Sequence, residues 1–259
     1  MREATKNPML KAWAEGRQLF GAWATIPSAV SAELMAREGP DFICIDNQHG
    51  LLDHSDTVPM IIAVETGGAI PIVRAPWNEP ARIMAPLDAG ARGVVIPMVN
   101  DAAEAQRAVA ACRYPPRGMR SYGPLRAKYV MGTTDPDELD DVACIVMVET
   151  ADGLKNLDDI ASTVGVDAIY IGPQDLSLAV GKKPSPKPYE TLAEPLALIK
   201  AACRRHGIAV GIHALNGETA RVYAEDGYDM ITVVSDLSIL ARAISENVAM
   251  AREGVGKRR

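Results

Sequence analysis

The sequence lacks paired cysteines and long apolar runs. Its four cysteines lie far apart and form no C-x-x-C pair, which argues against both a zinc site and a disulfide framework. No apolar stretch approaches the roughly 20 residues that a membrane span requires. The N-terminus also lacks the pattern of a secretory signal. These absences predict a cytoplasmic protein that has no membrane partner.

The sequence also lacks a basic cluster. The formal net charge is −6, and lysines and arginines are scattered along the chain except at residues 257–259. Nucleic-acid binding needs a concentrated basic surface, so no nucleic-acid partner is expected. Residues 253–259 are predicted to form a flexible tail.

Short apolar runs alternate regularly with helical patterns. A chain of 259 residues suits one α/β barrel, and we expect residues 1–259 to form a single domain. Eight strand and helix units predict a closed (β/α)8 (TIM) barrel. An open doubly wound sheet is the alternative, but the motif G-x-G-x-x-G is absent after the first strand. The predicted strands are 19–26, 42–45, 70–73, 93–96, 142–148, 168–171, 208–212 and 230–234.

Predicted helices fill most of the chain between these strands. A long irregular region, 113–141, is predicted to be a loop insertion that acts as a lid or an interface. The predicted helices are 7–19, 28–38, 55–65, 79–89, 101–112, a helix and a helical turn ending at 164, one ending at 206, 216–225 and 235–252.

Polar side chains follow several of the predicted strands. The strand 42–45 runs directly into Asp46 and His49, and Arg74, Glu149 and Asp175 follow the third, fifth and sixth strands. In a parallel barrel the residues after the strands converge on one face, where ligands bind. The sequence therefore predicts a site at this face, although Asp46 as a helix cap is the simpler alternative.

These residue types suit chemistry on a carbonyl compound. Glu149 and Asp175 follow neighbouring strands, so they are candidates to share a hard cation such as Mg²⁺ or Mn²⁺. Arg74 is a candidate to stabilise an oxyanion, or else to form an ion pair at the barrel mouth. His49 is a candidate general base, with Asp46 or Asp88 holding its ring.

Two further absences restrict the classes of reaction and substrate that are expected. No lysine stands at a strand end, so a Schiff base has no nucleophile, and a metal must polarise the carbonyl group instead. The loops after the seventh and eighth strands carry no glycine-rich phosphate cradle, which indicates a substrate without phosphate.

Six segments together resemble one enzyme family. They are similar, in order and over nearly the whole chain, to the metal-dependent (class II) 2-oxo acid aldolases of the HpcH/HpaI family. The segments are IDNQHG (45–50), IVRAPWNEP (72–80), PLDAGARGVVIPMV (86–99), RYPPRGMRS (113–121), VETADGLKNL (148–157) and IGPQDLS (171–177).

The resemblance implies a role for each matched residue. Glu149 and Asp175 would hold Mg²⁺, Mn²⁺ or Co²⁺, and Arg74 would stabilise the transition state. His49 would be the base, Asp88 the carboxylate that raises its basicity, and Asp46 a neighbour of the base.

The resemblance also implies how the substrate is held. The backbone amides of Gln174 and Asp175, in a segment that begins with Gly172 and Pro173, would bind the carboxylate of a 2-oxo acid. The chain departs from several members at two positions. Gln48 replaces a glutamate beside the base, and Met147 replaces a glutamine at the keto-acid site, where a thioether is a weak acceptor.

The implied reaction joins pyruvate, or a donor like hydroxypyruvate, to an aldehyde, or cleaves the 4-hydroxy-2-oxo acid product. The implied assembly is a homo-oligomer, usually a hexamer (a trimer of dimers) in which the last helix is exchanged between subunits. Apolar residues of that helix (Ile239, Leu240, Ile244 and Val248) need a cover, and burial against their own barrel is the simpler alternative.

Two other functions remain open. A CoA-thioester lyase of the citrate or malyl type would share the metal site but needs a basic surface for the nucleotide. A catalytically silent barrel that binds and senses a keto acid is the other alternative.

Overall fold

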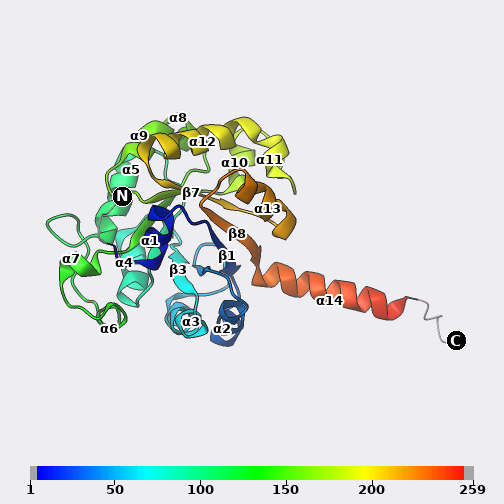
Figure 1. The fold of residues 1–259 in the computed structure, drawn as a ribbon, viewed down its shortest axis with the longest axis horizontal. Coiled ribbons are helices and arrows are strands. Elements are labelled where there is room, and N and C mark those ends of the chain that lie inside the picture. Colours follow the sequence, from blue (N-terminus) through cyan, green and yellow to red (C-terminus); the bar gives the residue numbers. More distant parts are fainter. Residues whose placement is uncertain (1–4, 254–259) are drawn as a thin grey trace.

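The computed structural model describes residues 5–253, and its centre is a closed barrel of eight parallel strands (Figure 1). Each strand pairs with its neighbours in sequence, and β8 closes the barrel against β1. The predicted (β/α)8 barrel is thereby confirmed. The strands are β1 (Leu19–Ala24), β2 (Phe42–Asp46), β3 (Ile70–Arg74), β4 (Gly93–Ile96), β5 (Ala143–Met147), β6 (Ala168–Ile171), β7 (Ala209–His213) and β8 (Met230–Ser235).

Helices surround the barrel, and α1 lies where the strands begin (Figure 1). They are α1 (Pro8–Ala14), α2 (Ala29–Arg37), α3 (His54–Gly67), α4 (Pro80–Asp88), α5 (Ala102–Cys112), α6 (Ala127–Met131), α7 (Pro136–Leu139), α8 (Ala151–Lys155), α9 (Leu157–Ser162), α10 (Pro173–Ala179), α11 (Pro188–Thr191), α12 (Ala193–His206), α13 (Gly217–Glu225) and α14 (Asp236–Arg252).

The strands are apolar on both faces because one face fills the barrel and the other meets the helices. On β2, Phe42 and Cys44 belong to the interior cluster, whereas Ile43 and Ile45 pack against the surrounding helices. All four cysteines are buried and unpaired, as expected for small apolar residues. The rigid barrel fixes the ends of its strands, where the polar residues stand.

Two short stretches of helix interrupt the region predicted to be irregular. Residues 113–141 contain α6 and α7. The two ends of this insertion are joined by a hydrogen bond of 2.9 Å from the Tyr114 backbone N–H to Asp140. The sequence prediction also missed α10, which starts immediately after β6 and carries Asp175. The metal-ligand candidate that follows β6, Asp175, therefore stands in the first turn of a helix.

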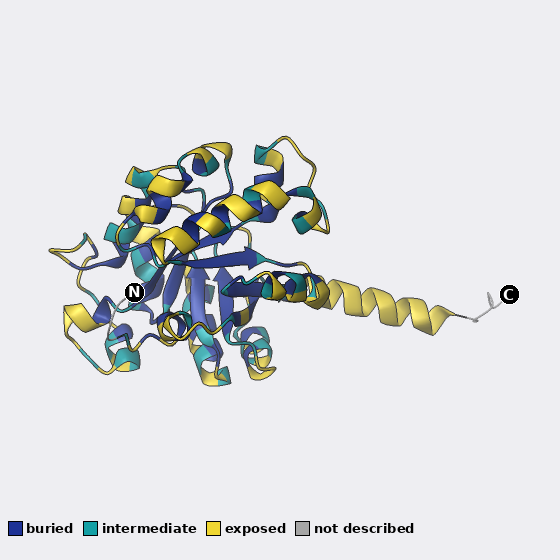
Figure 2. Ribbon diagram, turned by 45° about the horizontal axis from the view of Figure 1, so that its top comes forward, coloured by how far each residue is buried: buried dark blue, intermediate teal, exposed yellow. Residues whose placement is uncertain are grey.

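The last helix, α14, leaves the barrel and projects away from it (Figures 1 and 2). Its only buried residue is Asp236, at its start. Burial of this helix against its own barrel, the simpler alternative, is therefore wrong. The expected flexible tail, residues 253–259, lies outside the described residues except for Glu253. Within residues 5–253, no helix combines the length and apolarity needed to cross a bilayer.

Candidate active site

Asp46 and Arg74 form a buried ion pair at the ends of adjacent strands. The register places Asp46 opposite Arg74, and the guanidinium donates from Nε to Oδ1 over 2.8 Å and from Nη2 to Oδ2 over 2.6 Å. The side chains are 3% and 11% exposed. A bidentate pair in a desolvated site holds its guanidinium in one orientation.

The same carboxylate shapes the turn that carries His49. Asp46 Oδ1 accepts hydrogen bonds from the backbone N–H groups of Gln48 (3.1 Å) and His49 (3.2 Å). The backbone then closes so tightly that a Cβ at Gly50 would overlap the Asp46 carbonyl oxygen. No hydrogen bond to the His49 ring occurs within residues 5–253. Asp46 thus positions the loop and Arg74, and its carboxylate does not hold the imidazole.

Glu149 is a buried carboxylate just beyond β5. It is 2% exposed, and its Oε1 accepts a hydrogen bond of 2.9 Å from the backbone N–H of Met98. Met98 has a φ of 57°, a conformation rare for a residue other than glycine. Oε2 lies against Gly172, where any Cβ would overlap it. The carboxylate is therefore fixed by backbone on both sides.

The electrostatics of Glu149 place Asp175 nearby. Burial and, to a smaller extent, the negative charge of Asp175 raise the pKa of Glu149 to about 7, against the hydrogen bond from Met98 and the charge of Arg74. Two like charges within reach in a partly buried site suit a shared cation. Within residues 5–253 no group of three or more histidine, cysteine, aspartate or glutamate side chains could enclose a metal ion. The pair therefore fits a divalent cation whose other positions are filled by water and substrate.

The residues between β6 and α10 face this pair. The backbone N–H groups of Gln174 and Asp175 start α10 without a side-chain cap, because Gly172 is its N-cap residue and Pro173 has no N–H. Met147 is buried, and its Cε lies close to Gly172, so it supplies an apolar wall.

Asp88, the carboxylate that the resemblance assigns to the base, is hydrogen-bonded to Arg120. It ends α4 and accepts a hydrogen bond of 2.7 Å from Arg120 Nη2, whose side chain is fully buried beside the ring of Tyr114. Burial raises the pKa of Asp88, and the Arg120 guanidinium opposes that shift. No hydrogen bond joins Asp88 to His49 within the described chain. Its role toward the base stays a prediction.

A polar network inside the barrel mouth was missed by the sequence analysis. Trp23 Nε1 on β1 donates to both His213 Nδ1 and Thr232 Oγ1, each over 3.0 Å, and Tyr170 bonds Thr232. The guanidinium of Arg74 stands 4.4 Å from the centre of the Trp23 ring. His213 directly follows the seventh predicted strand, 208–212, so the rule that singled out Arg74 and Glu149 also applied to it.

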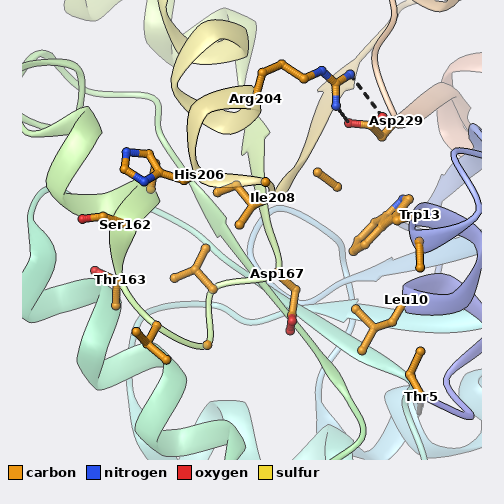
Figure 3. A pocket seen from close by; sticks show the side chains of 17 residues that line it. Thr5, Leu10, Trp13, Ser162, Thr163, Asp167, Arg204, His206, Ile208 and Asp229 are labelled. Atoms are coloured by element: carbon orange, nitrogen blue, oxygen red, sulfur yellow. Dashed lines mark hydrogen bonds and ion pairs between the residues drawn. The ribbon is translucent and has the colours of Figure 1, made fainter. Parts of the chain in front are cut away.

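A cavity of about 650 Å³ lies at the opposite end of the barrel (Figure 3). Its acidic residues are engaged in structural contacts. Asp229, just before β8, pairs with Arg204 over 2.8 Å and accepts the Val210 N–H, and Asp167, just before β6, accepts the Cys144 N–H. These contacts hold the beginnings of strands, which is the stabilising end of such barrels. The active-site candidates are therefore at the other end.

Comparison with known proteins identifies the family of the chain. Residues 19–243 match the HpcH/HpaI aldolase/citrate lyase family. The chain is 39% identical over 248 residues to a hydroxypyruvate/pyruvate aldolase of Rhizorhabdus wittichii, covering 95% of this chain and 99% of the relative. It is 34% identical to a 4-hydroxy-2-oxo-heptane-1,7-dioate aldolase of Shigella flexneri, covering 96% and 97%.

A solved structure shows the same fold. It is an HpcH/HpaI aldolase/citrate lyase family protein from Burkholderia cenocepacia, with a TM-score of 0.85 and 32% identity, covering 96% of this chain and all of that one.

Proposed function

The chain belongs to the HpcH/HpaI aldolase/citrate lyase family, and from that membership we propose that it is a divalent-metal-dependent aldolase of 2-oxo acids. The donor is pyruvate or hydroxypyruvate, and the acceptor is an aldehyde. The observation that carries the proposal is the pair of carboxylates on neighbouring strand ends. Glu149 is buried, held by backbone and within the electrostatic reach of both Asp175 and Arg74.

Different groups of the protein would bind the metal and the substrate carboxylate. Glu149 and Asp175 would hold Mg²⁺, Mn²⁺ or Co²⁺, which supplies Lewis-acid polarisation of the keto group when bound. The free N–H groups of Gln174 and Asp175 would bind the substrate carboxylate, since amides at a helix start favour anions. Met147 and Gly172 would present an uncharged wall to the keto acid.

Arg74 and His49 would carry the chemical step. In cleavage, His49 accepts the proton of the C4 hydroxyl, the C3–C4 bond breaks to release an aldehyde, and the electron pair passes to the 2-oxo acid as an enolate. Arg74 stabilises the negative oxygen, and it needs no reorientation because Asp46 already holds it. Return of the proton to C3 completes the formation of the keto acid.

We also propose that α14 docks on a second copy of the chain. Because α14 turns away, the outer side of β1 is left partly uncovered, and Phe20 there is 37% exposed. The apolar residues of α14 are exposed as well, and exposed patches of this kind mark interaction surfaces. Exchange of this helix between copies would cover both surfaces and is compatible with a hexamer.

A pyruvate-release assay tests the proposed reaction. The protein is incubated with 4-hydroxy-2-oxo acids and Mg²⁺, Mn²⁺ or Co²⁺, and lactate dehydrogenase reports pyruvate. We expect cleavage that EDTA abolishes, and a loss of at least about 100-fold in kcat for His49→Ala, the usual range for a general base. His206→Ala, at the far end of the barrel, is the matched control because the only hydrogen bond of its ring within residues 5–253 is to Asp158.

The variant at His49 is cleaner than one at Arg74. No hydrogen bond to the His49 ring occurs in the described chain, whereas removal of Arg74 leaves Asp46 as an unpaired buried charge. Cleavage at the wild-type rate in His49→Ala would refute the assignment. Release of a product only from CoA thioesters would support a lyase of the citrate type. Binding of keto acids without turnover would support a binding barrel.

A further inference from the structure

His213 is a polar residue of the barrel mouth that the proposed mechanism leaves unused. It is the last residue of β7, and it stands opposite Thr232 of β8. The charges of Arg74 and Asp46 both act on its ring, so it shares the mouth with the groups proposed to act on the substrate. The contacts of its ring therefore bear on how the substrate is held.

The contacts of Nδ1 fix the protonation of the ring. Trp23 Nε1 and Thr232 Oγ1 each lie 3.0 Å from His213 Nδ1. The hydroxyl can donate or accept, but an indole N–H can only donate. Nδ1 therefore presents its lone pair, and the proton of the neutral ring is on Nε2. Burial lowers the pKa of His213 to about 4, with the charge of Arg74 acting in the same direction. The imidazole is therefore a neutral donor at pH 7, not a base.

The Nε2–H group is left available. No partner for Nε2 occurs within the described residues, yet Nε2 is not among the buried polar atoms that lack a partner. It therefore reaches solvent, and it does so at the end of β7 where the mouth opens. A fixed, neutral N–H group suits an uncharged oxygen better than a charged one. The α10 amides are already assigned to the substrate carboxylate, and Arg74 to the oxygen that becomes negative.

We propose that His213 Nε2–H donates a hydrogen bond to a hydroxyl oxygen of the substrate and thereby gives preference to hydroxylated substrates. The proposal rests on the proposed aldolase function. The hydroxyl has two sources, the C3 hydroxyl of a donor such as hydroxypyruvate or the hydroxyl of a hydroxyaldehyde. His213 is in this account a specificity residue, because proton transfer is left to His49.

Two substitutions separate this donor from the structural contacts of the ring. In His213→Asn the side-chain oxygen replaces Nδ1 as the acceptor for Trp23, and the distal donor is lost. In His213→Gln the longer amide keeps a donor near the Nε2 position but gives up the acceptor. A role confined to packing would make the glutamine variant at least as defective as the asparagine variant.

The experiment compares four aldol additions catalysed by the metal-loaded full chain. Hydroxypyruvate and pyruvate are each combined with glycolaldehyde and acetaldehyde, and product formation gives kcat/KM. We expect His213→Asn to lower the hydroxylated-to-plain ratio roughly five- to tenfold, as for loss of one neutral hydrogen bond. His213→Gln and the remote control His206→Asn should keep the wild-type ratio. The ratio that falls identifies whether the donor or the aldehyde carries the hydroxyl.

The outcomes distinguish the two proposals. Wild-type turnover with unchanged ratios in His213→Asn overturns the role of His213 and leaves the aldolase standing. Equal loss on all four pairs in both variants assigns the ring to structure and also overturns it. Absence of metal-dependent turnover in the wild type is a failure of the proposed function instead.

Discussion

At the scale of single residues, the contact between Glu149 and Gly172 is the most demanding feature of the site. A Cβ at residue 172 would overlap Glu149 Oε2. We expect Gly172→Ala to displace the carboxylate and to weaken binding of Mn²⁺ by about tenfold or more, a loss typical of disturbed metal-site support. Calorimetric titration with Mn²⁺ measures this.

Gly217→Ala is the matched control, because a Cβ there meets nothing within 4 Å. Equal Mn²⁺ affinity in Gly172→Ala and Gly217→Ala would show that the carboxylate has room to move and that the contact is unimportant.

The buried carboxylate of Glu149 is expected to lower the folding stability of the metal-free protein as the pH rises. Burial raises the pKa of Glu149 from 4.5 to about 7, so its contribution to stability is present below pH 4.5 and is lost as the pH rises through 7. The loss amounts to about 3 kcal/mol at roughly 1.4 kcal/mol per pKa unit. Glu149→Gln removes it while an amide oxygen can still accept the Met98 N–H.

Urea unfolding in EDTA at pH 5 and pH 8 measures this cost. The glutamine variant should be more stable than wild type at pH 8 and nearly equal at pH 5, and excess Mg²⁺ should stabilise wild type only. The same difference in unfolding free energy at both pH values would contradict a raised pKa as its origin.

The residues of the site divide into those that sequence position reveals and those that it does not. Arg74 and Glu149 were predictable because each directly follows an apolar strand, and the same rule applied to His213. The strained backbone at Met98 and the close approach of Gly172 were not. Both arise from the distance between neighbouring strand ends, which no local sequence pattern encodes.

At the scale of elements, Asp236 joins the end of the barrel to its beginning. Its carboxylate accepts hydrogen bonds from Thr25 N–H (2.9 Å), Ile26 N–H (3.0 Å) and Thr25 Oγ1 (2.6 Å), and it is 7% exposed. Asp236→Asn replaces one acceptor oxygen with a donor. We expect it to lower the unfolding free energy by roughly 2 kcal/mol, because a buried donor loses its partner.

Thermal unfolding followed by circular dichroism checks this value. The exposed Asp152, in the first turn of α8, provides the control substitution Asp152→Asn, for which no comparable loss is expected. A melting temperature for Asp236→Asn as high as that of the control would show that the loop after β1 does not depend on this carboxylate.

Strands were easier to predict than helices for a physical reason. A barrel strand is a short apolar run between polar residues, and β4 and β6 have the predicted bounds. The helix α10 has only seven residues and starts at a proline, so it leaves no amphipathic period to detect. The course of α14 was equally hidden, since an apolar stripe does not say which surface covers it.

At the scale of the whole molecule, one end of the barrel stabilises the fold and the other carries the candidate active site. Where the strands begin, acidic residues such as Asp229 pair with arginines and with backbone N–H groups. Where they end, Glu149 accepts the Met98 N–H but neither Glu149 nor the nearby Asp175 forms an ion pair in the described chain, and Arg74 is held by Asp46. The stability of one end permits uncompensated charge at the other.

The projection of α14 predicts that the folded protein is an assembly. Leu240 and Ile244 are 51% and 56% exposed one turn apart, and Asp236 is the only residue of the helix that is buried against its own barrel. Burying each side chain on a second copy stabilises the complex by roughly 1.5–3 kcal/mol. We therefore expect Leu240→Glu with Ile244→Glu to reduce the mass measured by light scattering to that of a smaller species.

The control is Arg242→Glu, which lies on the same helix between the two but outside the stripe they form. Far-ultraviolet circular dichroism shows whether the barrel persists in each variant, because most helices surround the barrel and do not depend on α14. A wild-type protein that sediments as a 27.7 kDa monomer would refute the docking of α14. An oligomer of unchanged mass in the double variant would refute it equally, since two charges cannot be buried in an apolar contact without weakening it.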